Sequence, residues 1–137
     1  MKYGSAIIII NSKGEILLQH RDGNAPTDKN TWALWGGGQE GNETATETAM
    51  RELEEELSIV VKKEELTLYK KYKLDYLDKQ GEKRSKEVCV FVLEDRGLFK
   101  YVLKEGDDMK FFEIEEIAML PLAKYPKIWL YDYCHIA

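Results

Sequence analysis

One segment of this sequence has the pattern of an amphipathic helix, and it lies between segments typical of β-strands. From Thr44 to Leu57, apolar side chains recur at spacings of three and four residues, and acidic residues lie near its start. Strand-like runs precede it at 5–10, 15–20 and 32–35, and others follow at 66–77, 87–94 and 109–113. This order predicts an α/β fold in which helices cover a mixed sheet.

Two further helical segments are expected near the end of the chain. Residues 114–120 form a short one that Pro121 stops, and residues 126–136 form an amphipathic helix that Pro126 opens. The 137 residues suit a single domain, 1–137, with one sizeable core.

Composition and charge exclude several classes of protein. The net charge of −5 argues against a nucleic-acid polymer as partner. The longest apolar run, 6–10, is far shorter than the roughly 20 residues that cross a membrane, so we expect no membrane association and a cytoplasmic protein. The two cysteines, Cys89 and Cys134, lack metal-ligand spacing and are expected to be packed thiols.

Three glutamates of the predicted helix share one side. At about 100° per residue, Glu52, Glu55 and Glu56 lie on an arc that starts at the edge of the apolar stripe around Leu53. No basic residue lies one turn from Glu52 or Glu56, so a cation is the missing partner. Oxygen ligands crowded together suit Mg²⁺ or Mn²⁺. The alternative is a solvated acidic face without function.

The glycine-rich stretch before this helix does not match a phosphate-binding loop. Gly36, Gly38 and Gly41 have the spacing of a dinucleotide-binding fingerprint, but Glu40 and Glu43 would meet the pyrophosphate at the helix start. The lysine and hydroxyl residue of a P-loop are also missing after Gly41. A purely structural turn stays open as an interpretation.

The joint pattern of the glycines and the helix resembles the signature of the Nudix (MutT-like) hydrolase family. That signature is a glycine, five residues, a glutamate, seven residues, then Arg-Glu-aliphatic, a spacer, Glu-Glu, a spacer, glycine and an aliphatic residue. The matching positions are Gly37, Glu43, Arg51, Glu52, Leu53, Glu55, Glu56 and Ile59. The exception is Ser58, where the family has the glycine that serves a left-handed helix exit.

The resemblance implies an α/β/α sandwich and a metal-dependent enzyme. Such enzymes hydrolyse the pyrophosphate linkage of a nucleoside diphosphate joined to another moiety X, giving a nucleoside monophosphate and phospho-X. By the same resemblance, Mg²⁺ or Mn²⁺ is held mainly by Glu55 and Glu56 and completed by the Gly37 carbonyl. Glu52 is then a ligand or the base that deprotonates the attacking water.

Two further roles follow from the resemblance to the family. Arg51 would orient a box glutamate such as Glu43 rather than touch substrate. In some members the base comes from a later loop, and Glu105 is the candidate here, although a solvated turn fits it equally well.

Substrate specificity is only weakly encoded in the sequence. Arg21 and Lys29, in the loop 21–31, are candidates for phosphate contacts, and Trp35 is a candidate for stacking on a base. Isolated surface cations and core aromatics explain the same residues without function.

Two rival interpretations concern the whole protein. One is a catalytically inactive Nudix-fold nucleotide-binding or sensor module, and the other is a structural domain with an acidic surface. The aromatic residues of the terminal helix serve either packing or a homodimer contact. The expected partner in the leading interpretation is a small-molecule nucleotide.

Overall fold

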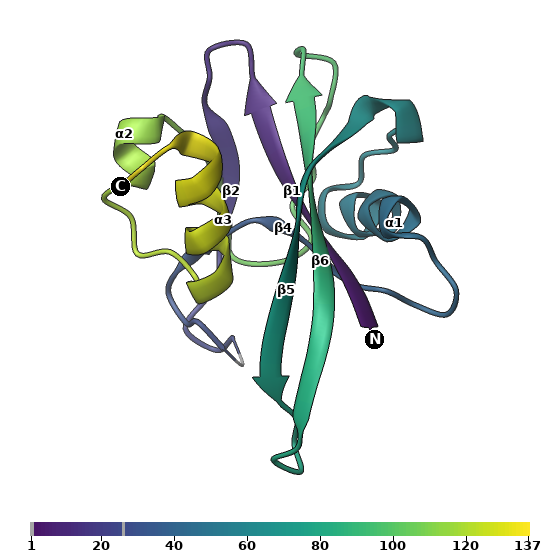
Figure 1. Ribbon diagram of the computed structural model, residues 1–137. Helices are drawn as coiled ribbons and strands as arrows, with labels where there is room; N and C mark the ends of the chain where they lie inside the picture. Colours follow the sequence, from purple (N-terminus) through teal and green to yellow (C-terminus); the bar gives the residue numbers. More distant parts are fainter. Residues whose placement is uncertain (1, 26) are drawn as a thin grey trace.

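The chain forms a mixed β-sheet with helices on both faces (Figure 1). The computed structural model describes residues 2–25 and 27–137. The strands are β1 (Lys2–Asn11), β2 (Ile16–His20), β3 (Trp32–Ala33), β4 (Trp35–Gly38), β5 (Leu66–Leu77), β6 (Lys83–Asp95) and β7 (Asp108–Phe112). Their order is β3-β2-β1-β6-β5, with β4 paired to β1 and β7 to β2. The pairing of β1 with β6 is parallel and the other pairings are antiparallel, which confirms the expected mixed sheet.

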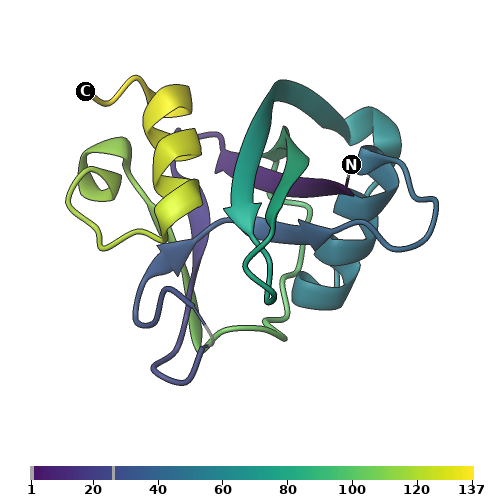
Figure 2. The same cartoon turned by 60° about the horizontal axis from the view of Figure 1, so that its bottom comes forward.

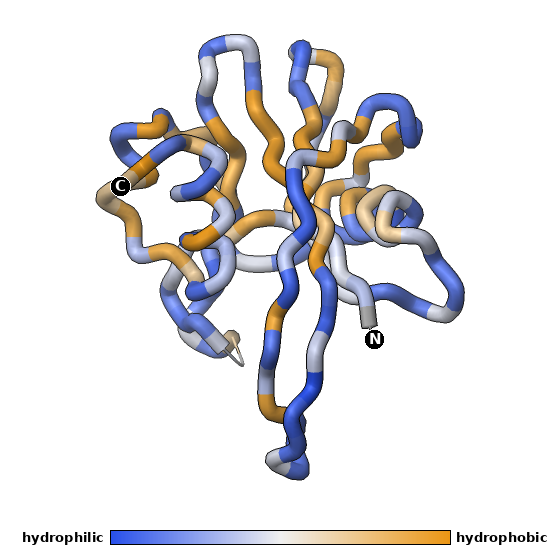
Figure 3. Tube along the Cα trace, in the orientation of Figure 1, coloured by the Kyte–Doolittle hydropathy of each residue, from blue (hydrophilic) through white to orange (hydrophobic). Residues whose placement is uncertain are grey.

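Strand β1 divides the hydrophobic core into two layers. Its odd-numbered residues Ile7 and Ile9 pack with helix α1 (Ala45–Leu57), whereas Ala6 and Ile8 pack with helix α3 (Lys124–Cys134). This alternation follows from the pleat of a strand that is buried on both faces. Apolar residues accordingly concentrate in the central strands, and polar residues occupy the outer loops (Figure 3).

Helices α1 and α3 lie on opposite sides of the sheet, with the short helix α2 (Ile114–Ile117) beside α3 (Figure 1). Figure 2 shows the same arrangement from a second direction. The expected α/β sandwich is therefore confirmed. Helix α1 begins where the sequence predicts, because Thr44 caps it and exchanges hydrogen bonds with Glu47. A short 3-10 helix, η1 (Lys63–Glu65), precedes β5.

Several boundaries differ from the sequence prediction; the short helix α2, for example, ends at Ile117 and does not reach residue 120 before Pro121. Helix α3 starts at Lys124, so Pro126 is in its first turn but does not open it; a proline is tolerated there because first-turn N–H groups have no helical partner. The predicted strand 32–35 is broken at Leu34 into β3 and β4. Strand β6 begins at Lys83, since the turn to β5 is shorter than expected. In the described part of the chain, none of the helices has the length and apolar character needed to span a membrane.

Candidate active site

The carboxylate of Glu56 is buried at the C-terminal end of α1. Its residue is 2% exposed, and its Oε1 accepts a hydrogen bond of 2.8 Å from the backbone N–H of Gly36 in β4. Its Oε2 accepts one of 3.3 Å from the Gln19 side chain in β2. The last turn of a helix disfavours acidic side chains, and α1 has no basic residue there. The position of Glu56 therefore costs stability, and the donors around it are neutral.

The loop before β7 brings a second carboxylate to Glu56. The backbone N–H groups of Val102 and Lys104 donate to the carbonyls of Leu57 and Glu56, both at 2.9 Å, and so satisfy the free end of α1. Glu105 follows directly, and its side chain hydrogen-bonds Glu56. Burial, followed by this hydrogen bond, raises the pKa of Glu56 to about 9. Glu56 is therefore protonated at neutral pH in the metal-free fold.

Glu52 is the third carboxylate of this group, which we call the acidic cluster (Glu52, Glu56 and Glu105). Burial raises the pKa of Glu52, and the charges of Glu55 and Glu105 add to this effect. A Cβ atom built on Gly37 would overlap the Glu52 carboxylate. Glycine at this position therefore lets α1 approach β4 closely enough for the carboxylate to lie against the strand backbone.

Arg51 links this cluster to the glycine-rich loop. Its guanidinium binds both carboxylate oxygens of Glu43, at 2.8 and 3.0 Å, and also donates to the Gly38 carbonyl at 2.9 Å. The bidentate contact lowers the pKa of Glu43 to about 2. One nitrogen of Arg51 reaches Glu52 Oε1 at 2.9 Å. The spacing argument that left Glu52 without a basic neighbour is thus wrong for Glu52, because the adjacent Arg51 bends over it.

Glu55 lies apart from the acidic cluster. Its side chain is 55% exposed and one of its oxygens is 3.2 Å from Arg51. Within residues 2–25 and 27–137, no three His, Cys, Asp or Glu side chains are arranged as a formed metal site. The donor chemistry nevertheless fits a hard cation, since burial disfavours the charges of the Glu52 and Glu56 carboxylates and the Glu105 carboxylate lies close to Glu56.

The comparisons with known proteins identify the family. The model of the NUDIX domain matches residues 2–133, nearly the whole chain. The chain belongs to the Nudix family. A search of curated proteins found no match.

Solved structures of Nudix proteins share the fold. A MutT protein from Bacillus halodurans is 21% identical with a TM-score of 0.75, and the match covers 98% of this chain and 83% of that one. The Escherichia coli dihydroneopterin triphosphate pyrophosphohydrolase is 21% identical with a TM-score of 0.74, covering 98% and 96%. A Caenorhabditis elegans Ap4A hydrolase is 22% identical with a TM-score of 0.66, covering 97% and 95%. With the family model, these neighbours support a pyrophosphohydrolase in general terms.

Among the described residues, the side chains predicted to bind substrate make no hydrogen bond or ion pair with the acidic cluster of this Nudix domain. Trp35 is 1% exposed and its indole N–H donates to the Leu17 carbonyl at 2.9 Å, so its ring belongs to the core and offers no stacking face. Arg21 donates to the Thr27 carbonyl within its own loop, and Lys29 is exposed in the same loop. Among the described residues, no ion pair joins either cation to the cluster.

Sequence reasoning missed Gln19. It is 4% exposed, and its amide donates to both Glu56 and the Leu34 carbonyl, the latter at 3.0 Å. The available signal was a lone amide inside the apolar run of β2, since a buried polar side chain needs partners. Gln19 holds Glu56 in place against β4.

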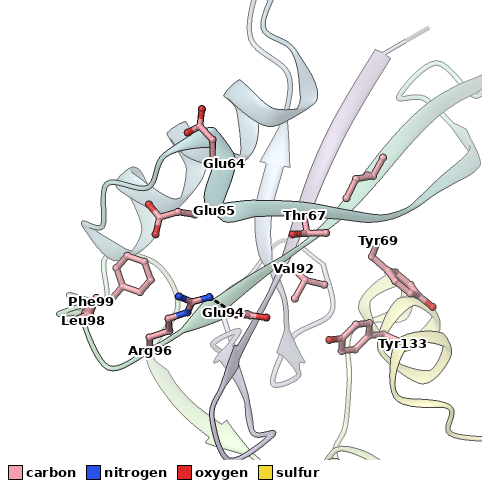
Figure 4. A pocket seen from close by; sticks show the side chains of 11 residues that line it. Glu64, Glu65, Thr67, Tyr69, Val92, Glu94, Arg96, Leu98, Phe99 and Tyr133 are labelled. Atoms are coloured by element: carbon pink, nitrogen blue, oxygen red, sulfur yellow. Dashed lines mark hydrogen bonds and ion pairs between the residues drawn. The ribbon is translucent and has the colours of Figure 1, made fainter.

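A cavity that the acidic cluster does not line lies elsewhere in the Nudix fold. It has a volume of about 820 Å³ and lies between η1, the β5–β6 pair and α3 (Figure 4). Arg96 pairs with Glu94 at 3.2 Å on one side, and Tyr69 and Tyr133 pack edge to face on the other. None of the carboxylates of the acidic cluster lines it, so volume is a poor guide to the site.

Proposed function

We propose that this Nudix protein hydrolyses the pyrophosphate linkage of a nucleoside diphosphate joined to a moiety X, with Mg²⁺ or Mn²⁺ as cofactor. The observation that carries the proposal is the acidic cluster: beside the glycines of β4, burial raises the pKa of Glu52 and Glu56 on α1, and Glu105 approaches Glu56 from its own loop. A structural role does not explain this arrangement, because a buried carboxylate such as Glu56, with no ion pair among the described residues, destabilises a fold. We place the enzyme in the cytoplasm, acting on a small-molecule nucleotide.

In this proposal, the chain's own residues hold and orient the reacting groups. Glu52 and Glu56 supply ligand oxygens, Glu55 joins them by turning away from Arg51, and the Gly37 carbonyl completes the set. When bound, the metal ion supplies positive charge for the diphosphate and acidifies a water molecule.

Four residues act beside the metal ligands, either as the general base or by keeping Glu52 in position. Glu105, on its separate loop, or Glu52 takes the proton of the attacking water. Arg51 keeps Glu52 in position, and Glu43 fixes Arg51 from the other side. Arg51 is thus a positioning residue.

A phosphate-release screen tests the proposal. Nucleoside triphosphates, nucleotide sugars, dinucleoside polyphosphates and dinucleotide coenzymes are incubated with the protein and Mg²⁺, Mn²⁺ or EDTA, with a phosphatase added to release phosphate from the products. We expect one substrate class to be cleaved with either metal and none with EDTA. Equal rates in EDTA, or no cleavage of any class with either metal, would contradict the proposal.

The inactive nucleotide-binding module remains the second candidate. One structural neighbour, the NUDIX domain of Shewanella oneidensis NrtR, was crystallised with ADP ribose; it is 16% identical, with a TM-score of 0.73 and coverage of 96% of this chain and 84% of that one. Binding of ADP ribose to this protein without turnover in Mg²⁺ or Mn²⁺ would favour that candidate.

A further inference from the structure

The loop that carries Glu105 is attached to the rest of the fold on both sides of that residue. We call residues 101–107 the Glu105 loop. Before Glu105, two backbone N–H groups of the loop donate to carbonyls at the end of α1. After it, the backbone N–H of Asp107 donates to the carbonyl of His20, the last residue of β2, at 3.1 Å. The loop therefore bridges α1 and β2, and Glu105 lies between the two attachments.

A side-chain contact strengthens the attachment to β2. Nδ1 of His20 lies 2.7 Å from Oδ1 of Asp107, so these residues are joined through both backbone and side chains. An ionised carboxylate only accepts hydrogen bonds, so Nδ1 is the donor. The His20 ring packs edge to face on Trp32 with 4.9 Å between the ring centres, and 22% of its side chain is exposed, against 51% for Asp107. A packed ring thus holds an exposed carboxylate and, with it, the end of the Glu105 loop.

The residue that follows Glu105 makes this close approach possible. Gly106 has a φ of 79°, in the left-handed region that favours glycine. A Cβ atom at this position would lie 2.6 Å from the His20 carbonyl oxygen and 3.3 Å from the side-chain oxygen of Gln19. A larger residue would therefore push the loop off β2 and away from Gln19, whose amide contacts Glu56.

We propose that His20 and Asp107 are positioning residues, which keep the Glu105 carboxylate beside Glu56 so that it can take the proton of the attacking water. The inference rests on the proposed function, because it concerns how a candidate base of that site is held. A half-exposed pair of this kind contributes little to the stability of a fold. A general base, in contrast, must stay within hydrogen-bonding reach of its water, and a small displacement lowers the rate strongly. The Glu105 side chain lies on an exposed loop, so its position depends on these attachments.

A double-mutant cycle tests whether the pair acts through Glu105. His20→Phe keeps a ring on Trp32 and removes the nitrogen that contacts Asp107. With Mg²⁺ and the substrate that the screen identifies, we expect this variant to lower kcat about tenfold and to leave KM within about twofold. The reason is that the loop carries the base and none of the residues predicted to contact substrate. In the Glu105→Gln background, the same change should have no further effect on kcat.

Three more variants separate the contact from its surroundings. Asp107→Ala should lower kcat as much as His20→Phe does. The matched control is Asp108→Ala, which removes an exposed carboxylate from the next position and should keep kcat. His20→Asn places an amide nitrogen near the position of Nδ1 and should recover most of kcat, although it loses the contact with Trp32. Thermal unfolding should then occur at a lower temperature in His20→Asn than in His20→Phe, because stability depends on the ring and kcat on the donor.

Hydrogen exchange separates this inference from the proposed function, since it needs neither metal nor substrate. In EDTA, NMR follows the backbone N–H groups of Lys104 and Asp107 in wild type, His20→Phe and Asp108→Ala. Exchange at both positions should become about tenfold faster in His20→Phe and stay unchanged in Asp108→Ala. This result would support the inference even if no substrate is hydrolysed.

Three results would overturn the inference and leave metal-dependent hydrolysis in place. The first is unchanged exchange of the loop in His20→Phe. The second is an equal loss of kcat from His20→Phe in the wild-type and Glu105→Gln backgrounds. The third is a Glu105→Gln variant with the kcat of the wild type.

Discussion

Two clusters of polar side chains in this protein show opposite electrostatics. In the acidic cluster, burial raises the pKa of Glu52 and Glu56, in Glu52 despite the hydrogen bond from Arg51. In the second cluster, which we call the α3 tie (Lys70, Tyr72 and Asp132), donors on β5 surround a carboxylate on α3. The hydroxyl of Tyr72 and then the ammonium of Lys70 lower the pKa of Asp132.

The difference is whether the protein itself supplies the partners of a buried or half-buried carboxylate or whether a bound ligand must supply them. The α3 tie connects β5 to α3 with its own donors and acceptors, so it contributes to stability without any ligand. The acidic cluster costs stability until a cation binds. Substitutions should therefore have opposite effects on stability in the two clusters. In the acidic cluster, they should abolish activity and raise the stability of the metal-free protein. In the α3 tie, they should lower stability and leave activity unchanged.

The largest expected effect is on the activity of Glu56→Gln. Removal of a metal ligand from the acidic cluster should lower kcat by at least about 100-fold with the substrate that the screen identifies. The thermal stabilisation of the protein by millimolar Mg²⁺ should also disappear. The matched control is Glu54→Gln, which neutralises an exposed glutamate of the same helix. Near wild-type turnover by Glu56→Gln, or an equal loss in Glu54→Gln, would refute the assignment.

The pH dependence of stability gives the second effect. Because the pKa of Glu56 rises from 4.5 to about 9 on folding, the folded state binds more protons than the unfolded state between these values. The free energy of unfolding of the metal-free protein should therefore fall as the pH rises through this window. Urea denaturation of wild type and Glu56→Gln in EDTA, at pH 5 and pH 8, measures this.

In that experiment, Glu56→Gln lacks the titrating group and should gain stability over the wild type as the pH increases. The two curves share every other ionisable residue, so their difference reports Glu56 together with its neighbour Glu105. A difference that is the same at both pH values would mean that Glu56 is ionised in the folded protein already at pH 5, and the contrast between the two clusters would fail.

The acidic helix was predictable from sequence because its determinants are local. The Thr44 cap, the spacing of the apolar residues and the glutamates all lie within one segment, and α1 starts and ends where they indicate. The surroundings of the acidic cluster, in contrast, depend on contacts between segments that are far apart in the sequence. The parallel pairing of β1 with β6 joins segments about eighty residues apart and has no turn signal between them.

The same limit applies to the individual residues of the site. The placement of Glu105 depends on two backbone hydrogen bonds from 102 and 104 to the end of α1, which no spacing rule reports. The sequence left two roles open for Trp35, because an aromatic residue on a short strand can point to either face; in the structure its side chain is buried in the core. Gln19 lies beside Glu56 through a cross-sheet contact that its sequence neighbours do not reveal.

The third prediction concerns the α3 tie. Tyr72→Phe removes the hydroxyl that donates to Asp132 and keeps the ring that packs near Trp129 at 6.0 Å. Loss of this hydrogen bond should lower the free energy of unfolding by about 1 kcal/mol, measured by urea denaturation. The hydrolysis rate at saturating substrate should stay within about twofold of wild type, since the change spares the acidic cluster. A tenfold loss of kcat with an unchanged free energy of unfolding would show that the α3 tie serves activity and not stability, against the expected contrast with the acidic cluster.

The smallest expected effect comes from a change in the backbone at the end of α1 that leaves the carboxylates of the helix untouched. Ser58 ends the helix in the left-handed conformation, with φ of 58° and ψ of 33°, where a side chain is strained and glycine is not. Ser58→Gly should therefore raise the free energy of unfolding by about 0.5 kcal/mol, with kcat unchanged. Ser58→Ala is the control, because alanine keeps a Cβ atom and gains nothing. If Ser58→Gly raises the free energy of unfolding but also lowers kcat, the position of Glu56 depends on the strained end of the helix. Stability and activity at this end of α1 would then be coupled.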